Sequence, residues 1–513
     1  MSVSEHGLLV ALGGFAQQVG VPAAMERVAV PMKTVEHSPG EKLTELLVHL
    51  LGGGQHVNEL ERSPQPLVAD QTVARAWGQA RFASASGVNA VLRAATSETV
   101  SGLKAAVRQV LEPYRRRVLR EVAPAWLVVD CDLTGLVVSD QATTYEGADF
   151  GYMGEVGGVG RGYQFARAQL QGRHDPLLLG GFLHAGRTIS AHCLAELVAS
   201  IEAELGRPRR RVELIEQRLA EATEQLADLQ ARLARRTTRQ PGRGARLQAR
   251  CERTAAAVAT LAARRTALLA DNAANPTPRR ILLRLDGGFG TAALLAWLYE
   301  QGYDFVARAH SGQVAATLQT EPDFRWEKIS QNGWLAESQR TSVGDCPYPM
   351  RVFASRQWWG DARPERWSAL LASPSLPAAE WSVRRVGVFY NGRQTIEATT
   401  KEGKGLLASR QLPTRHQAGI AVYQQLVLFA QNLLRWFRRQ CLGHTPIAAA
   451  GLAELVRIGA HSPAVLHRDH DLRWLQFTGT SPWRGLRLAW QTPLAFQLWF
   501  PFLDDYLSAH YQP

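Results

Sequence analysis

The sequence predicts an α/β protein. Three strand-like segments are followed by a helical one, and this order is typical of helices layered on a sheet: 125–133, 162–170, 176–186 and 191–205. A second strand, helix and strand follow later in the chain, at 279–286, 290–301 and 303–309. With 513 residues, the chain is long enough for about three domains.

The charge balance predicts a polyanionic partner. Lys and Arg total 58 against 46 Asp and Glu, which gives a net charge of +12, so nucleic acid or an anionic membrane fits. No apolar run reaches the length of about 20 residues that spans a bilayer, and the apolar start of the chain has no basic flank typical of a signal peptide. The five cysteines form no C-x-x-C pair, so we expect neither disulfides nor zinc. These features favour a cytoplasmic protein that binds nucleic acid.

The first 120 residues are predicted to be mostly helical. A break within them is interpreted as the turn of a helix-turn-helix, with Ser84 or Ser86 capping the next helix. That helix would carry Asn89 and Arg93 outward. A plain helical packing domain explains the same pattern equally well.

Residues 207–276 form a distinct segment. Apolar residues recur three and four apart on both sides of a Pro-Gly turn near 237–244, which predicts an antiparallel helical hairpin. Arginines crowd around the turn, where acidic residues are scarce. This pattern is typical of a solvated surface, and it also fits a contact with DNA or a partner. The candidate DNA-binding residues are Arg235, Arg236, Arg239 and Arg243.

The remaining chain is predicted to alternate between regular and irregular parts. Residues 310–388 are rich in Trp, Pro and Ser and are expected to be an irregular insertion. Amphipathic helices follow near Gln394 and at 418–440, and strand-like pieces occur in the tail. The predicted segments are 1–120, 121–206, 207–276, 277–309, 310–388, 389–440 and 441–513.

Four acidic residues are candidates for a metal site. Asp130 and Asp132 lie two apart on one predicted strand and therefore project to the same face. Asp286 ends a second strand, and Glu397 lies on a later helix. Carboxylates from strand ends and a helix can converge on Mg²⁺. A lone Asp after a strand also commonly caps a turn.

The segment around Glu397 contains a spaced set of four residues: Tyr390, Arg393, Glu397 and Lys404. On one continuous helix, Arg393 and Glu397 would share a face, and Lys404 would follow about two turns later. Lysine is scarce in this chain, so its presence here is informative. The Y-(2)-R-(3)-E-(6)-K spacing resembles the signature of a large group of bacterial insertion-sequence DDE transposases.

The resemblance extends to the strands. The sequence WLVVDCDLTG is similar to the first catalytic strand of these enzymes, in which Asp is often followed by one residue and Thr. The first catalytic Asp is then Asp132, with Asp130 as the alternative or a supporting acid, and Asp286 is the second. The resemblance implies a ribonuclease-H-like core with a mixed sheet, preceded by a helical DNA-binding domain. The hairpin at 207–276 is not expected in common members.

The resemblance also implies an activity. Asp132, Asp286 and Glu397 would bind two Mg²⁺ (or Mn²⁺) ions, cut transposon ends and join the 3′-hydroxyl to target DNA. Tyr390, Arg393 and Lys404 would bind DNA. The implied partners are double-stranded DNA, namely terminal inverted repeats and target, and a second copy of the chain, and the implied location is the bacterial nucleoid.

Two other functions remain open from the sequence. One is a domesticated or inactive transposase that acts as a DNA-binding regulator, and the other is a ribonuclease-H-like nuclease that cuts but does not join. Some relatives hold a flipped base with an aromatic residue of the insertion, although core packing also explains each aromatic here. The candidates are Trp326, Trp334, Trp358, Trp359, Trp367 and Trp381.

Overall fold

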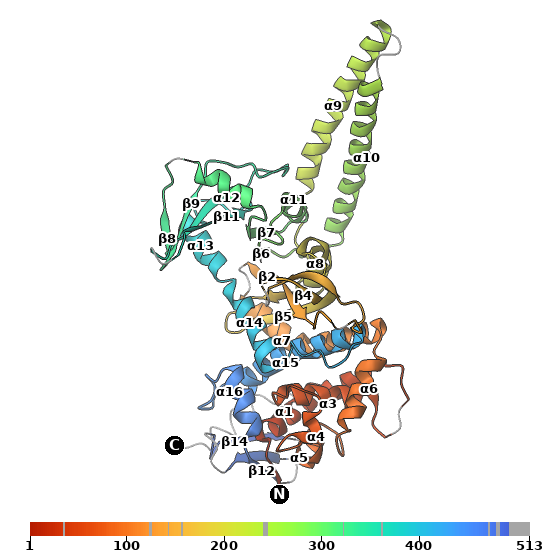
Figure 1. The fold of residues 1–513 in the computed structure, drawn as a ribbon, viewed down its shortest axis with the longest axis vertical. Coiled ribbons are helices and arrows are strands. Elements are labelled where there is room, and N and C mark those ends of the chain that lie inside the picture. Colours follow the sequence, from red (N-terminus) through yellow and green to blue (C-terminus); the bar gives the residue numbers. More distant parts are fainter. Residues whose placement is uncertain are drawn as a thin grey trace. The chain divides into compact units, whose positions relative to one another are not determined.

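The computed structural model describes residues 1–491 except 34–35, 123–125, 142, 155–156, 240–244, 322, 361–362, 470–471 and 479–482. The chain forms two compact units, and Figure 1 colours them along the sequence. Unit 1 comprises Met1–Val122, Asp132–Cys193 and Gln394–Pro513, and unit 2 comprises Ala123–Cys131 and Leu194–Arg393.

Unit 1 is built around a long helix, α15 (Gln417–Cys441), which is buried along most of its length, polar residues such as Gln431 and Asn432 included. The aromatic rings of Tyr114 and Trp436 stack 5.7 Å apart, and Phe15 meets Trp436 edge-on at 5.1 Å. The amino-terminal helices thus share a core with α15 and do not form a freestanding domain. They are α1 (Gly7–Gln18), α2 (Val21–Glu26), α3 (Pro39–Leu51), α4 (Glu59–Arg62), α5 (Gln71–Ala76), α6 (Ala85–Ala94) and α7 (Ser97–Val122).

The predicted cap at Ser84 is confirmed, but the helix-turn-helix is not. Ser84 Oγ accepts a hydrogen bond from the Gly87 N–H at 3.2 Å, at the start of α6. Helices α5 and α6 are joined by residues 77–84, which is longer than the turn of about three or four residues in that motif. The linker buries Trp77, whose Nε1–H donates to the Leu9 carbonyl at 2.9 Å, so packing sets its path.

The strands predicted for unit 1 are present. Strand β4 (Gly158–Leu170) pairs antiparallel with β5 (Leu177–Ala185) and with β3 (Asp149–Met153), and β3 was not predicted. Strand β2 (Leu127–Val137) continues through Thr134 and Gly135, beyond the predicted end at residue 133. Its residues from Asp132 onward belong to unit 1. The predicted helix after β5 is α8 (Ser190–Leu205), whose residues from Leu194 onward belong to unit 2. In unit 1, α14 (Gln394–Leu406) precedes α15.

The carboxyl-terminal part of unit 1 adds a small antiparallel sheet of four strands. Both predicted strands are present, as β13 (Leu472–Phe477) and β14 (Arg487–Gln491). Two unpredicted strands complete the sheet, β12 (Ala464–Asp469) and the short β1 (Ser2–Ser4). A short helix, α16 (Leu452–Arg457), precedes β12 in the chain.

Unit 2 contains a mixed sheet, as predicted. The first part of β2 pairs parallel with β6 (Ile281–Leu285), which pairs parallel with β7 (Asp304–Arg308). Strand β11 (Arg366–Ala372) continues antiparallel to β7, followed by β10 (Arg351–Gln357), β9 (Gly333–Glu337) and β8 (Glu327–Ser330). The helices are α11 (Ala292–Glu300), α12 (Gly312–Gln319) and α13 (Val383–Asn391).

The expectation that 310–388 is an irregular insertion is wrong. Its strands extend the sheet of unit 2, and one face carries the apolar cluster of Leu335, Phe353 and Leu370, against which Trp381 and Val386 pack. Strands β10 and β11 are buried on both faces over Val352–Ala354 and Ala369–Ala372. Trp334 and Trp367 both lie opposite Arg356, and these residues interrupt the apolar pattern in the sequence.

The predicted hairpin is present as α9 (Val212–Arg239) and α10 (Ala245–Ala273), which lie side by side in Figure 1. Val212, Ile215 and Leu268 form its buried contact, with Leu261 packed against them. The predicted turn includes residues 240–244, which lie outside the described residues, and so does the candidate Arg243.

Candidate active site

Asp130 is held in a buried ion pair of unit 2. Arg284 lies opposite it on β6 and donates from Nε and Nη2 to its two carboxylate oxygens at 2.6 and 2.7 Å. The Asp130 side chain is fully buried, and Arg284 also donates from Nη1 to the Phe389 carbonyl at 3.0 Å. This pairing gives Asp130 a structural role in joining β2 to β6, so Asp132 is the better candidate for a metal ligand.

Asp132 has a different environment, in unit 1. Its side chain is partly buried, and its Oδ2 accepts a hydrogen bond from Thr134 Oγ1 at 2.7 Å. The two residues lie two apart on β2 and therefore share a face. The Asp-x-Thr pattern thus has a local physical basis, because the hydroxyl orients the carboxylate.

Glu397 lies in the first turn of α14, where the helix dipole favours a negative charge, and its side chain is exposed. Neighbouring residues fix this part of the helix. Arg167 on β4 donates from Nη2 to the Ile396 carbonyl at 2.7 Å, and Gln431 on α15 donates from Nε2 to the Thr399 carbonyl at 2.9 Å. The backbone next to Glu397 is therefore held from both the sheet and α15.

Lys404 connects α14 to the strand of Asp132. Its Nζ donates to the Gly135 carbonyl on β2 at 3.2 Å. With Thr134 and Arg167 it lines a narrow cavity of about 10 Å³ between the helix and the sheet. Within unit 1, the helix of Glu397 and the strand of Asp132 are thus joined directly.

Asp286 lies in unit 2, directly after β6. Its Oδ1 accepts from the Gly288 N–H at 2.9 Å, and its Oδ2 accepts from Arg393 Nη2 at 3.3 Å. The largely buried Arg393 also donates to the Cys131 carbonyl at 3.4 Å. Arg393, which is predicted to hold DNA phosphates, thus contacts the second candidate Asp.

The spacing predicts that Arg393 and Glu397 lie on one continuous helix, but in the structure they do not. Helix α13 ends at Asn391 and α14 begins at Gln394, which leaves Arg393 between them. At Gly392 an added Cβ would lie 2.1 Å from Arg284 Nη1. The same Nη1 donates a hydrogen bond to the Phe389 carbonyl. A tertiary contact therefore shapes the end of α13.

The other predicted DNA contacts have varied environments. Tyr390 is partly buried against the apolar cluster that includes Trp381 and Val386, so it contributes to packing. Arg235 and Arg236 are exposed on α9, and Arg239 ends that helix. Two residues of α6, Asn89 and Arg93, are predicted to point outward. They line an open concavity together with Arg415 and His416.

The candidate tryptophans divide into two groups. Trp381 is buried and meets Phe389 edge-on at 5.1 Å, which confirms a packing role. Trp326 and Trp334 flank the guanidinium of Arg356, at 4.6 and 5.6 Å from their ring centroids. Trp358 is 51% exposed on the same part of unit 2. A partly exposed group of aromatic and cationic side chains therefore covers part of this sheet.

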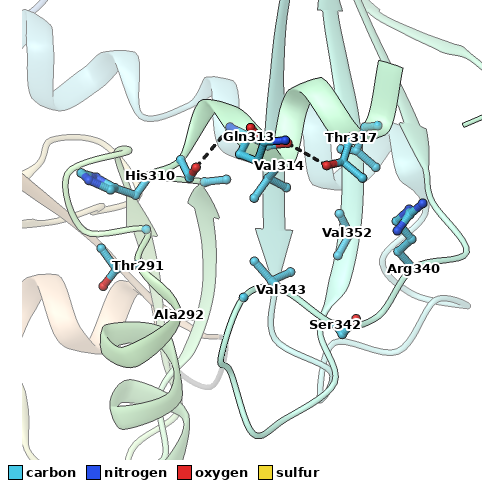
Figure 2. Close-up of a pocket in the computed structure, with 15 residues that line it drawn as sticks. Thr291, Ala292, His310, Gln313, Val314, Thr317, Arg340, Ser342, Val343 and Val352 are labelled. Atoms are coloured by element: carbon cyan, nitrogen blue, oxygen red, sulfur yellow. Dashed lines mark hydrogen bonds between the residues drawn. The ribbon is translucent and has the colours of Figure 1, made fainter. Parts of the chain in front are cut away.

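The sequence did not predict a pocket of about 400 Å³ beside α12, which Figure 2 shows. Val314, Val343 and Val352 form its apolar wall, and Arg340 lies at its edge. His310 follows β7, and its Nδ1 lies 2.9 Å from the Gly287 carbonyl in the loop after Asp286. Ligands commonly bind at the carboxyl ends of parallel strands. The polar residues after β7 are therefore the sequence feature from which this pocket could have been predicted.

Among the described residues, no group of three or more His, Cys, Asp or Glu side chains is placed to hold a metal ion. Nor does any helix in the described parts of the chain combine the length and apolarity needed to cross a membrane. No protein-family model matches the chain, and no curated protein matches its sequence.

Proposed function

We propose that the protein is a DDE transposase, which cleaves the ends of a DNA element by metal-dependent hydrolysis and joins the 3′-hydroxyl to target DNA. The observation that supports this most strongly lies in unit 1. There α14 carries both Glu397 and Lys404 of the spaced set, and Lys404 bonds the strand that carries Asp132, at Gly135.

The proposed metal ligands are Asp132, Asp286 and Glu397. Their carboxylate oxygens are the donors that Mg²⁺ and Mn²⁺ prefer. Mg²⁺ usually takes one or two carboxylates and completes its shell with water and substrate phosphate, so an all-protein cage is not required. When bound, two such ions activate the attacking oxygen and stabilise the leaving one.

The chain's own residues position these acids. Thr134 orients Asp132, and Arg393 orients Asp286. In the first step water attacks the phosphorus at the element end and the 3′-oxygen leaves. In the second step that 3′-hydroxyl attacks a target phosphodiester and displaces the 3′-oxygen of the target strand, which leaves as a hydroxyl, so no Ser or Tyr nucleophile on the protein is needed. Because two ends must be joined, we propose that two copies of the chain act together on double-stranded DNA.

The test is cleavage of a plasmid that carries the DNA flanking the gene. Asp286→Ala and Glu397→Ala should each lower Mg²⁺-dependent cleavage about 1,000-fold or more, because each removes an oxygen donor, while DNA binding stays near that of the unsubstituted protein. Glu454→Ala, at an exposed position of α16, is the matched control and should cleave normally.

Full cleavage by both variants would contradict the proposal. A strand-transfer assay with labelled 3′ ends then separates the remaining functions. Cleavage without joining would identify a nuclease, and binding with neither step would identify a DNA-binding regulator.

A further inference from the structure

The base of the α9–α10 hairpin is fixed by arginines whose charges are neutralised. Arg210 is 5% exposed and donates to Glu202 at 2.7 Å and to Asp271 at 2.9 Å. The buried Glu300 accepts from Arg218 at 2.9 Å and from Tyr348 Oη at 2.6 Å, and it also pairs with Arg264. These ion pairs attach both hairpin helices to α8 and α11 and leave little excess charge at the base.

The other end of the hairpin, the tip, has the opposite charge pattern. Five exposed arginines belong to the described residues of the tip, and none of them forms an ion pair or side-chain hydrogen bond with another described residue: Arg235, Arg236, Arg246, Arg250 and Arg253. Near them, Arg232 pairs with Asp228 and Glu252 accepts from Gln248. Within the part of the chain that the structure describes, the positive charge of these arginines is therefore largely uncompensated.

The spacing of these arginines places them in stripes. Arg246, Arg250 and Arg253 are four and three apart, so they share one face of α10. Arg246 and Arg253 line an open concavity of about 650 Å³ together with Ala249 and Ala256. The small alanines allow a polymer backbone to approach the helix closely while the guanidinium groups reach it from either side.

We infer that the tip of the hairpin binds double-stranded DNA through its phosphates, without reading the bases. This inference takes DNA as the polyanion from the proposed function. Guanidinium groups bind phosphate oxygens bidentately, and a cluster of like charges gains most from a dense line of phosphates. The side chains of the concavity are chiefly Arg and Ala, with Glu252 as its acid, and such a set favours backbone contacts over recognition of a particular base.

Because the hairpin is long, we separate the DNA contacts at its tip from the cleavage of DNA at the candidate catalytic acids. Helix α9 has 28 residues and is therefore about 42 Å long at 1.5 Å per residue. Because its base is ion-paired to the body of unit 2, the helix pair acts as a stiff arm. Contacts at its far end add affinity for DNA beyond the contacts made by the proposed metal ligands.

The experiment measures binding of the full-length protein to arbitrary 30-base-pair duplexes as a function of salt. The tip variant is Arg235→Ala/Arg236→Ala/Arg250→Ala. Each lost phosphate contact removes about 0.9 from the slope of log Kobs against log salt concentration. We expect a slope lower by about 2 to 3 and a Kd higher by about 10- to 100-fold at 0.1 M salt, equally on different sequences. Alanine in exposed helix positions preserves folding.

The control variant is Arg62→Ala/Arg75→Ala/Arg457→Ala, which removes three exposed arginines of unit 1 and gives the same net charge. For this control, the slope of log Kobs against log salt concentration should fall in magnitude by less than it does for the tip variant. An unchanged slope for the tip variant, or an equal loss in both variants, would overturn the inference. A loss confined to one duplex sequence would overturn it as well, because the tip would then read bases.

Cleavage separates this inference from the proposed function. Asp286→Ala should lose cleavage of flanking DNA while it keeps the salt slope of the unsubstituted protein, because Asp286 lies outside the hairpin. If the unsubstituted protein fails to cleave, the proposed function is wrong while the salt slopes still decide the role of the tip. If the tip variant retains its DNA affinity but loses self-association in light scattering, the tip binds a second copy and the inference is overturned.

Discussion

Two aspartates that lie two residues apart on β2 have opposite surroundings. Asp130 is fully buried, with both oxygens bound by Arg284, whereas Asp132 is partly exposed and is bound by Thr134. The sequence predicts that they share a strand face, but it does not reveal which one is paired, because Arg284 lies 154 positions away. Burial and pairing therefore distinguish a structural acid from a candidate metal ligand.

The first prediction concerns this ion pair. Asp130→Ala should lower the free energy of unfolding by about 3–5 kcal/mol, because it leaves the Arg284 guanidinium buried without its partner. Asp132→Ala, at a partly exposed position of the same strand, should lower it much less. Urea denaturation followed by circular dichroism measures both. Equal midpoints for Asp130→Ala and the unsubstituted protein would contradict the assigned role.

A second residue-scale prediction concerns Glu45 on α3. Burial raises the pKa of its carboxyl group to about 8 from about 4.5, with nearby Glu61 and Glu41 adding to the rise and a hydrogen bond from the Ala83 N–H opposing it. Because the folded-state pKa is the higher one, the contribution to stability is complete below about pH 4.5 and is lost as the pH rises to about 8.

Replacing Glu45 by Gln should remove this dependence. We expect the melting temperature of Glu45→Gln to fall by several degrees less than that of the unsubstituted protein between pH 6 and pH 8. Glu98→Gln, at an exposed position of α7, serves as the control and should keep the original pH profile. Parallel profiles for Glu45→Gln and the unsubstituted protein would show that Glu45 is ionised throughout.

At the scale of elements, hydrophobic periodicity predicted most helices and the buried strands. It identified the hairpin, α15 and the strands around Asp132 and Asp286 because each has one clear apolar face. It missed β8 to β11, because their apolar runs are short and are interrupted by Arg356 and the tryptophans opposite it. It also missed the break between α13 and α14, which depends on a tertiary contact with Arg284.

The third prediction tests that break with a pair of glycines. Gly392→Ala should destabilise the protein by about 1–3 kcal/mol, because its Cβ would lie 2.1 Å from Arg284 Nη1 and that side chain is fixed by Asp130 and Phe389. Gly405→Ala has no atom within 4 Å of its new Cβ and lies inside α14, so it should stabilise the protein by about 0.5–1 kcal/mol. Thermal unfolding compares the two, and shifts of the same sign would contradict this explanation.

At the scale of the whole molecule, the chain divides its candidate catalytic acids between two compact units. Asp132 and Glu397 belong to unit 1, and Asp286 belongs to unit 2 together with Arg393. The spaced set of Tyr390, Arg393, Glu397 and Lys404 also spans both units. Sequence spacing predicted these candidates, but the roles of Arg393 and Tyr390 in positioning and packing depend on contacts with distant strands.

The central claim is that Asp132, Asp286 and Glu397 act on the same two metal ions. The most direct measurement counts Mn²⁺ bound to the protein on element-end DNA by electron paramagnetic resonance. We predict two ions per active site for the unsubstituted protein, and fewer for Asp132→Ala, Asp286→Ala and Glu397→Ala. Glu454→Ala should retain both ions. Two Mn²⁺ ions bound by each of the three aspartate and glutamate variants would contradict the claim.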